Sequence, residues 1–150
     1  MILSYPLYSH HLNGKDSEVQ GEHPYALASF LYDVLNRVSL TTELAKATAY
    51  EVDLAVTHLA HTSPQDLLIM DRNYPSYRMM AELQHRNREF VIRCSTASFG
   101  IARQMFKGEG VESQTVTLTP CSKQMPQIQQ LGLPQSLTVR FVRVQLDTEE

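Results

Sequence analysis

The sequence predicts a mixed α/β domain followed by an antiparallel β segment, because the hydrophobic pattern changes along the chain. Between residues 26 and 106, short apolar runs of strand length alternate with segments whose apolar residues repeat at helical spacing. After Gly108, two segments instead alternate apolar and polar residues with the period of a half-buried strand. We therefore expect an α/β core in residues 1–108 and a β-rich segment in residues 109–150.

The composition is that of a globular domain. The chain has 150 residues, of which 43% are hydrophobic and 19% charged, which is enough apolar material for one core. No apolar run approaches membrane-spanning length, and residues 1–8 lack the basic start and cleavage site of a signal peptide. We expect a cytoplasmic protein with no membrane partner. Its two cysteines, Cys94 and Cys121, have no metal-ligand spacing and are interpreted as reduced structural thiols.

The first predicted elements are a loop and a strand pair. Residues 9–24 are polar and contain turn signals, which indicates a loop. The run from Ala26 to Leu35 is apolar with little alternation, which favours a buried strand but is also compatible with a helix. Asn36 and Arg37 would form a turn, and the β-branched residues between Val38 and Leu44 favour a returning strand.

A helix is predicted from Ala45 to His61, because alanine is frequent and apolar residues recur at i, i+3, i+4 and i+7. These residues are Val52, Ala55, Val56 and Leu59. Residues 62–65 end the helix with a proline-containing turn. His58 and His61 are spaced one helical turn apart, but no further ligand motif accompanies them, so a zinc site is disfavoured.

The next strand ends on a carboxylate. Leu67 to Met70 is an unbroken apolar run of strand length, and Asp71 follows at the point where the strand would leave the sheet. In open α/β sheets, ligands bind outside the carboxyl ends of the strands. A carboxylate there can hold a metal ion or a proton without being buried in the core. The alternative is that Asp71 only caps a turn or a helix.

A second helix and a further strand follow. Pro75 or Ser76 suits the start of a helix, with apolar side chains facing the sheet at Met79, Met80 and Leu83. Residues 89–94 form the next predicted strand, parallel to the preceding one because the connection contains a helix. Ser95 or Thr96 would cap a short helix that carries Phe99, Ala102 and Met105.

The C-terminal segment is predicted to be an antiparallel strand pair. Residues 111–118 and 137–146 alternate apolar and polar residues with a period of two. Residues 120–135 between them form a connection that is rich in glutamine and contains proline. We expect this pair to be appended to the α/β unit.

The charge pattern permits a local basic surface. The net charge of -3 argues against a free-standing nucleic-acid-binding module, which normally carries a basic excess. The basic residues do gather after the Asp71 strand, at Arg72, Arg78, Arg86, Arg88, Arg93, Arg103 and Lys107. They form either a basic face near Asp71 or an ordinary set of solvated arginines.

The residues around Asp71 resemble the second catalytic-aspartate segment of the DDE transposases of bacterial insertion sequences. In that family a hydrophobic strand ends in Asp-Arg-Gly-Tyr, a helix follows, and the next strand reads Phe-Val-Ile-Arg. The matching residues are 71–74, with Asn73 in place of the glycine, and 90–93. Residues 29–36 resemble the family's second strand, and residues 51–59 resemble the helix before the catalytic strand. The resemblance runs from Pro24 to Cys94 and continues more weakly to the C-terminus.

This resemblance implies a partial RNase H-like mixed sheet with flanking helices. It also implies DNA transposition, in which two Mg²⁺ ions held by three carboxylates assist phosphodiester cleavage and strand transfer at transposon ends and target DNA. The first Asp comes from the middle of the first strand, the second from the end of the fourth, and the Glu from a late helix. Asp71 matches the second and would be a catalytic metal ligand. By the same resemblance, Arg72, Tyr74 and Arg93 would contact DNA or support the site.

The other two carboxylates are not recognisable in the sequence. The first strand and its Asp are expected before Met1, because Asp16 lies in a polar stretch without strand pattern. The Glu-bearing helix is expected after the last strand, and Glu149 and Glu150 have no helical context. We therefore expect a transposase fragment that is inactive alone, with a raw sheet edge, an exposed apolar patch and a tendency to self-associate.

Two alternatives remain open at this stage. The chain could be a non-catalytic DNA- or protein-binding remnant that regulates a full-length transposase. It could also be an unrelated small α/β enzyme, although no second carboxylate or phosphate-binding glycine loop is apparent to build its site.

Overall fold

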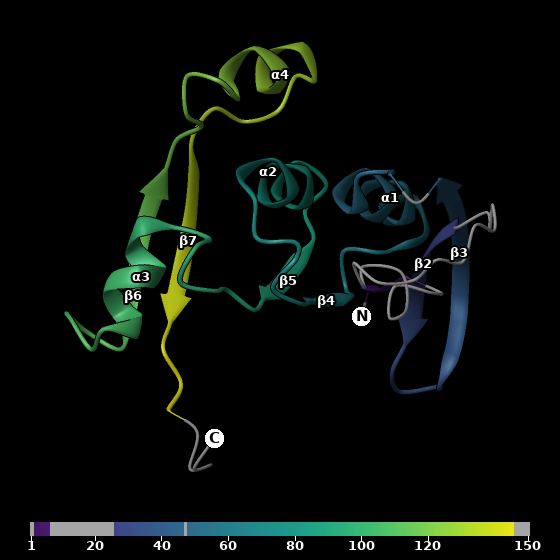
Figure 1. Ribbon diagram of the computed structural model, residues 1–150, viewed down its shortest axis with the longest axis horizontal. Coiled ribbons are helices and arrows are strands. Elements are labelled where there is room, and N and C mark those ends of the chain that lie inside the picture. Colours follow the sequence, from purple (N-terminus) through teal and green to yellow (C-terminus); the bar gives the residue numbers. More distant parts are fainter. Residues whose placement is uncertain (1, 7–25, 47, 146–150) are drawn as a thin grey trace, which may run out of the picture.

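The computed structural model describes residues 2–6, 26–46 and 48–145, which form a mixed α/β fold (Figure 1). A five-stranded sheet has the order β3-β2-β1-β4-β5. Its strands are β1 (Ile2–Pro6), β2 (Ala26–Asp33), β3 (Val38–Lys46), β4 (Leu67–Met70) and β5 (Glu89–Ile92). β2 is antiparallel to both of its neighbours, whereas β4 is parallel to β1 and β5. The sheet is therefore mixed, and the chain is an α/β protein, as the hydrophobic pattern predicted.

The central strand of this sheet corrects one prediction. β1 lies between β2 and β4, with Ile2 opposite Leu31 on one side and Met70 on the other. The raw sheet edge expected from a missing first strand is not found beside β2 and β4, because residues 2–6 pair with both strands. The loop predicted for residues 9–24 lies outside the described residues.

The predicted strand pair is confirmed as the hairpin β2–β3. Its turn is held by the Asp33 carboxylate, which accepts hydrogen bonds from the backbone N–H groups of Leu35 (2.9 Å) and Asn36 (3.0 Å). Arg37 completes the turn with a positive φ of 56°. β3 runs two residues further than predicted, to Lys46, because Ala45 and Lys46 pair with the start of β2. This pairing overrides the helical propensity of alanine.

The helix predicted from Ala45 is consequently shorter. It comprises α1 (Glu51–His58) and the 3₁₀ turn η1 (Leu59–His61). The second predicted helix is α2 (Tyr77–His85), and its cap is confirmed because Ser76 Oγ accepts the N–H of Met79 at 3.2 Å. Both helices cover the same face of the sheet (Figure 1). The core beneath them consists of Leu31, Val52, Ala55, Leu59, Leu68, Met70, Tyr74, Met79 and Leu83.

The opposite face of the sheet is apolar and open. Leu67 and Ile69 of β4 and Val91 of β5 alternate with the core residues and are 55%, 45% and 55% exposed. An exposed apolar patch was predicted as the result of a missing strand. A patch is present, although β1 fills the place between β2 and β4. No element among the described residues covers this face.

The chain continues after β5 into α3 (Gly100–Phe106), β6 (Ser113–Leu118), α4 (Met125–Gln130) and β7 (Leu137–Val142). β6 and β7 form the predicted antiparallel pair, as a separate two-stranded sheet. The predicted cap of α3 is wrong. Ser95 instead closes a turn with Ser98, whose Oγ accepts the Ser95 N–H at 2.9 Å, and Phe99 precedes the helix without a side-chain cap. The connection between the two strands contains α4, which was not predicted.

The hairpin packs against the far side of α2. A second apolar cluster joins residues of α2, α3, α4 and β7, namely Tyr77, Met80, Ala81, Ala102, Met105, Ile128, Leu133, Leu137, Val139 and Phe141. Met80 therefore belongs to this second cluster, against which Phe90 and Ile92 of β5 also pack. Tyr77 Oη donates to the carbonyl of Pro134 at 2.9 Å, and Phe99 meets Phe141 edge to face with ring centroids 5.7 Å apart. Apolar packing is thus continuous across residue 108.

Candidate functional site at the carboxyl edge of β4 and β5

Asp71 and Arg93 are the first residues after two neighbouring parallel strands, β4 and β5. Met70 lies opposite Ile92 in the β4–β5 ladder, and the Arg93 N–H donates to the Met70 carbonyl at 2.9 Å. The next residue on each strand is therefore Asp71 on β4 and Arg93 on β5. This edge is where parallel sheets bind their ligands.

The Asp71 carboxylate has no role in the local backbone structure. The turn after β4 is closed by the Asp71 carbonyl, which accepts the N–H of Tyr74 at 3.1 Å. The following helix is capped by Ser76 instead. The Asp71 side chain is exposed and makes no hydrogen bond or ion pair with the described residues. Since other groups fill the capping roles, the carboxylate is available to a ligand.

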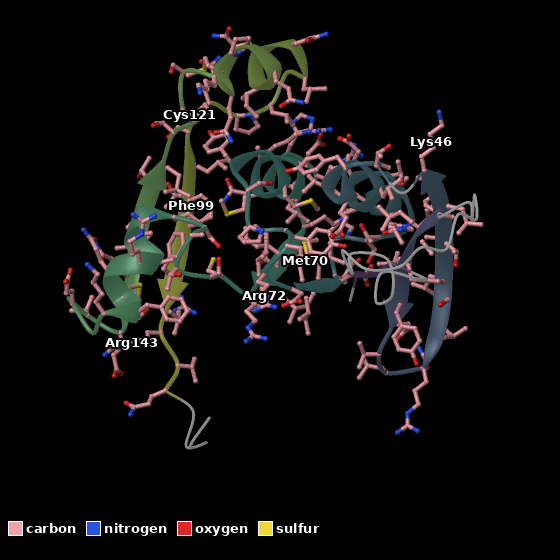
Figure 2. The ribbon with its side chains drawn as sticks, in the orientation of Figure 1. Lys46, Met70, Arg72, Phe99, Cys121 and Arg143 are labelled. Atoms are coloured by element: carbon pink, nitrogen blue, oxygen red, sulfur yellow. The ribbon has the colours of Figure 1, made fainter. Side chains whose placement is uncertain are left out.

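Two arginines beside Asp71 are likewise available. Arg72 and Arg93 are exposed, and neither guanidinium has a hydrogen-bond partner among the residues that the structure describes. Figure 2 shows Arg72 extending away from the ribbon. They are the two arginines best placed to meet an anion at this edge.

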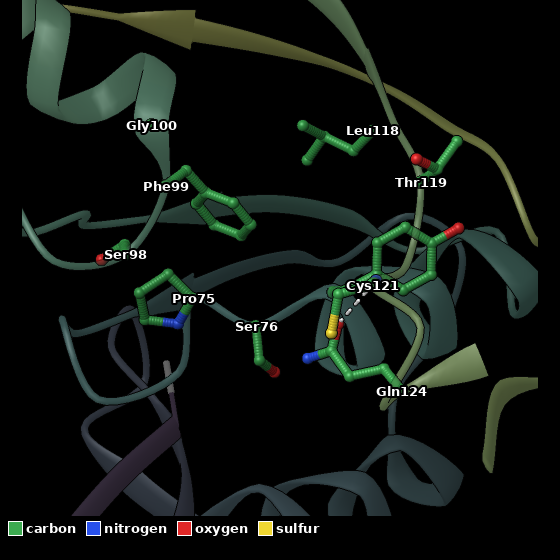
Figure 3. Close-up of a pocket in the computed structure, with 10 residues that line it drawn as sticks. Pro75, Ser76, Ser98, Phe99, Gly100, Leu118, Thr119, Cys121 and Gln124 are labelled. Carbon is green, nitrogen blue, oxygen red and sulfur yellow. Dashed lines mark hydrogen bonds between the residues drawn. The ribbon is translucent and has the colours of Figure 1, made fainter. Parts of the chain in front are cut away.

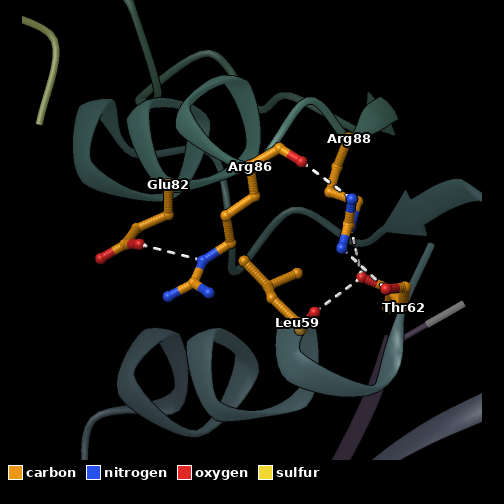
Figure 4. A network of polar contacts seen from close by, with 5 residues as sticks. All are labelled: Leu59, Thr62, Glu82, Arg86 and Arg88. Atoms are coloured by element: carbon orange, nitrogen blue, oxygen red, sulfur yellow. Dashed lines mark hydrogen bonds and ion pairs between the residues drawn. The ribbon is translucent and has the colours of Figure 1, made fainter. Parts of the chain in front are cut away.

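Most arginines of the predicted basic cluster form ion pairs or hydrogen bonds within the fold. Arg78 pairs with Asp53, and Arg86 pairs with Glu82 at 3.5 Å. Arg88 binds Thr62 through its Nε and Nη2 atoms, both at 2.7 Å (Figure 4). Arg103 Nε donates to the carbonyl of Thr96 at 3.2 Å. The interpretation as ordinary structural or solvated arginines therefore holds for these four.

Tyr74 supports the site from below. Its side chain is 1% exposed and belongs to the core between the sheet and the two helices. The turn that carries Asp71 and Arg72 thus rests on a buried ring. Burial leaves Tyr74 no surface for contact with DNA, so its role here is packing.

The described residues do not fit a two-metal centre. β1 lies beside β4, and Ile2 is level with Met70, so the later residues of β1 run alongside Asp71. Its sequence, Ile-Leu-Ser-Tyr-Pro, holds no acidic residue. Asp16, Glu149 and Glu150 lie outside the described residues. Within residues 2–6, 26–46 and 48–145, no group of three or more His, Cys, Asp or Glu side chains could hold a metal ion.

A cavity that the sequence did not predict lies at the start of α2. It has a volume of about 380 Å³ and is bounded by Pro75, Ser76, Phe99, Leu118 and Cys121, among others (Figure 3). These residues come from separate segments, so no local pattern could have indicated the cavity. All of its lining side chains are uncharged. It offers no carboxylate to a metal ion and no charged partner to a phosphate.

The two cysteines are not paired with each other. Both are free thiols, with Cys94 partly buried and Cys121 exposed. Burial raises the pKa of the Cys94 thiol, and a hydrogen bond with Ser98 opposes that effect. Cys94 is therefore a protonated thiol at neutral pH and not an activated nucleophile.

Comparison with known proteins adds no relative. No protein-family model, curated protein or solved structure matches this chain. No helix that the structure describes is both long and apolar enough to cross a membrane. The site is therefore argued from the geometry of this chain alone.

Proposed function

We propose that this chain is related to the RNase H-like catalytic domain of DDE transposases, and that the carboxyl edge of β4 and β5 binds the DNA backbone. Asp71 corresponds in this proposal to the second metal-binding carboxylate. Two features of the fold support it. Asp71 ends the fourth strand of a mixed sheet, as the resemblance implies, and the Phe90–Arg93 segment follows α2 in a strand parallel to β4.

The proposal rests mainly on the exposure of three charged side chains and on their lack of partners within the described ranges. Asp71, Arg72 and Arg93 are charged, exposed and without side-chain partners among the described residues. Arginine presents a planar set of donors that suits phosphate oxygens. A carboxylate at the same edge can share a Mg²⁺ ion with a bound phosphate, since Mg²⁺ is often held by one or two carboxylates together with substrate phosphates.

The same geometry favours DNA binding without cleavage. A two-metal phosphoryl transfer needs several carboxylates, and the described residues supply Asp71 without a complete set. The β1 strand beside it holds no acidic residue. In this proposal the chain binds transposon or target DNA and, as a non-catalytic relative, competes with a full-length transposase for it.

Fluorescence anisotropy with duplex DNA at several salt concentrations tests the binding surface. Arg72→Ala and Arg93→Ala should each weaken binding to all sequences and lower the slope of log affinity against log salt by about 1. Arg37→Asn is the matched control, because β2 is antiparallel to β1 and its turn therefore lies at the opposite sheet edge. Asparagine tolerates the positive φ of Arg37. Absence of salt-dependent binding, or an equal loss in Arg37→Asn, would contradict the proposal.

A plasmid-nicking assay with Mg²⁺ tests the absence of catalysis. The full chain should leave supercoiled DNA intact at concentrations that saturate binding. Nicking that disappears in Asp71→Asn would instead show a complete catalytic set. That result would overturn the non-catalytic part of the proposal and strengthen the transposase relationship.

A further inference from the structure

A buried polar pair joins α1 to the sheet. His58, the last residue of α1, is fully buried, and so is Ser29 on β2. The His58 Nε2 atom lies 3.0 Å from Ser29 Oγ. The other ring nitrogen, Nδ1, is buried and has no hydrogen-bond partner among the described residues. The pair sits next to the apolar side chains that pack α1 on the sheet.

This arrangement suits the neutral imidazole and not the charged one. A protonated histidine has two N–H donors, and the donor at Nδ1 would have no acceptor in the core. Burial lowers the pKa of His58, and nearby His61 lowers it further. Glu43 on β3 and an interaction with the backbone of Ser29 oppose the shift without cancelling it. α1 carries two carboxylates in its first turn, Glu51 and Asp53, and Asp53 is engaged by Arg78 of α2.

The rest of α1 depends on this packing. The helix has eight residues, and its first turn has no side-chain cap at Tyr50. An isolated helix of this length is not stable in water. Its position is therefore maintained by burial of Val52, Ala55 and His58, together with the Asp53–Arg78 ion pair.

The segment after α1 is fixed separately. Arg88, just before β5, binds both the hydroxyl and the carbonyl of Thr62 (Figure 4). Thr62 Oγ1 in turn donates to the carbonyl of Leu59 at 2.9 Å. The end of η1 is thus attached to the loop between α2 and β5. Thr62 is therefore held by contacts that do not involve the His58–Ser29 pair.

We propose that the His58–Ser29 pair is an acid-sensitive latch, whose protonation at His58 releases α1 from β2 while Arg88 holds the chain at Thr62. The released helix exposes His58 to water, where an imidazole has an ordinary pKa near 6.5. Above that pH, His58 is neutral in both the closed and the open form, so the closed form keeps its full stability relative to the open form. As the pH falls, the open form takes up a proton that the closed form rejects. Its population rises by at most about tenfold per pH unit until the lower pKa of the closed form is reached.

Amide hydrogen exchange on the full chain tests the latch. Between pH 7.0 and 5.5, after correction for intrinsic exchange rates, the opening constant of the α1 amides should rise severalfold, up to a limit of about eightfold. The amides of β4, β5 and α2 should not follow. Unchanged exchange of α1, or an equal rise throughout the sheet, would overturn the proposal.

Two variants and one titration make the test specific to His58. In His58→Gln, which retains a polar partner for Ser29 but does not titrate in this range, the α1 opening constant should be independent of pH. His61→Gln is the matched control and should keep the wild-type dependence. If His58→Gln fails to fold, the NMR titration of the wild-type His58 ring decides. A ring pKa at or above 6.5 would overturn the latch.

Discussion

An aspartate and an arginine lie at each end of the β4–β5 strand pair. Within the part of the chain that the structure describes, the side chains at the amino end are hydrogen-bonded to the fold, and those at the carboxyl end are not. At the amino end, Asp66 Oδ2 accepts the N–H of Ser63 at 2.7 Å, and Arg88 donates to Thr62 and to the carbonyl of Arg86. At the carboxyl end, Asp71 and Arg93 have no side-chain partner among the described residues. An aspartate or arginine beside a strand is therefore not informative by itself. Its partners show whether it stabilises the fold or remains available to a ligand.

The largest expected difference between the two ends is in the arginines. Arg88→Ala removes three hydrogen bonds and leaves Thr62 groups without their donor, so it should lower the free energy of unfolding by about 1–3 kcal/mol. Arg93→Ala should change it by less than about 0.5 kcal/mol, because an exposed side chain without partners is removed. Urea denaturation of both variants measures the difference. Equal destabilisation would mean that Arg93 has a structural role.

A smaller difference is expected for the aspartates. Asp66→Ala removes the acceptor for the Ser63 N–H in an exposed turn and should lower the free energy of unfolding by about 0.5–1 kcal/mol. Asp71→Ala should leave it within about 0.5 kcal/mol of wild type. The same denaturation curves provide the measurement. A larger loss for Asp71→Ala than for Asp66→Ala would show that the Asp71 carboxylate serves the turn.

The sequence predicted the elements whose patterns are local. The β2–β3 hairpin, the apolar strand β4, the Ser76 cap of α2 and the alternating strands β6 and β7 all follow from residue spacing over one element. Their order also implied that β4 and β5 are parallel. These features needed no knowledge of distant contacts, which explains why they could be predicted.

The errors arose where the local structure depends on pairing or packing with residues far away in the sequence. The five residues of β1 become a strand because β2 and β4 lie on both sides of them, and no pattern within them shows this. Ala45 and Lys46 have good helical propensity but are held in β3 by the ladder with β2. Met80 belongs to a cluster that includes residues of β7, which lie far along the chain and could not be assigned to it from local spacing.

The position of the candidate site could be predicted from the sequence. Which of its charged side chains have partners in the fold could not. The apolar run before Asp71 placed the carboxylate at a strand end, and the parallel strands placed Arg93 beside it. The sequence could not show that Ser76 and the Asp71 carbonyl fill the capping roles. It also could not separate Arg72 and Arg93 from the arginines that pair with Asp53, Glu82 and Thr62.

The most direct test of the Asp71 assignment is the DNA affinity of Asp71→Asn, measured with EDTA and with Mg²⁺ at constant ionic strength. Without Mg²⁺, the wild-type carboxylate repels the phosphates, so Asp71→Asn should bind DNA severalfold more tightly. With Mg²⁺, the wild type should gain affinity relative to Asp71→Asn, since the ion is shared between the carboxylate and a phosphate. Asp66→Asn, at the other end of β4, should behave as wild type in both buffers. If Asp71→Asn also matches wild type in both, Asp71 does not face bound DNA and the proposed assignment is contradicted.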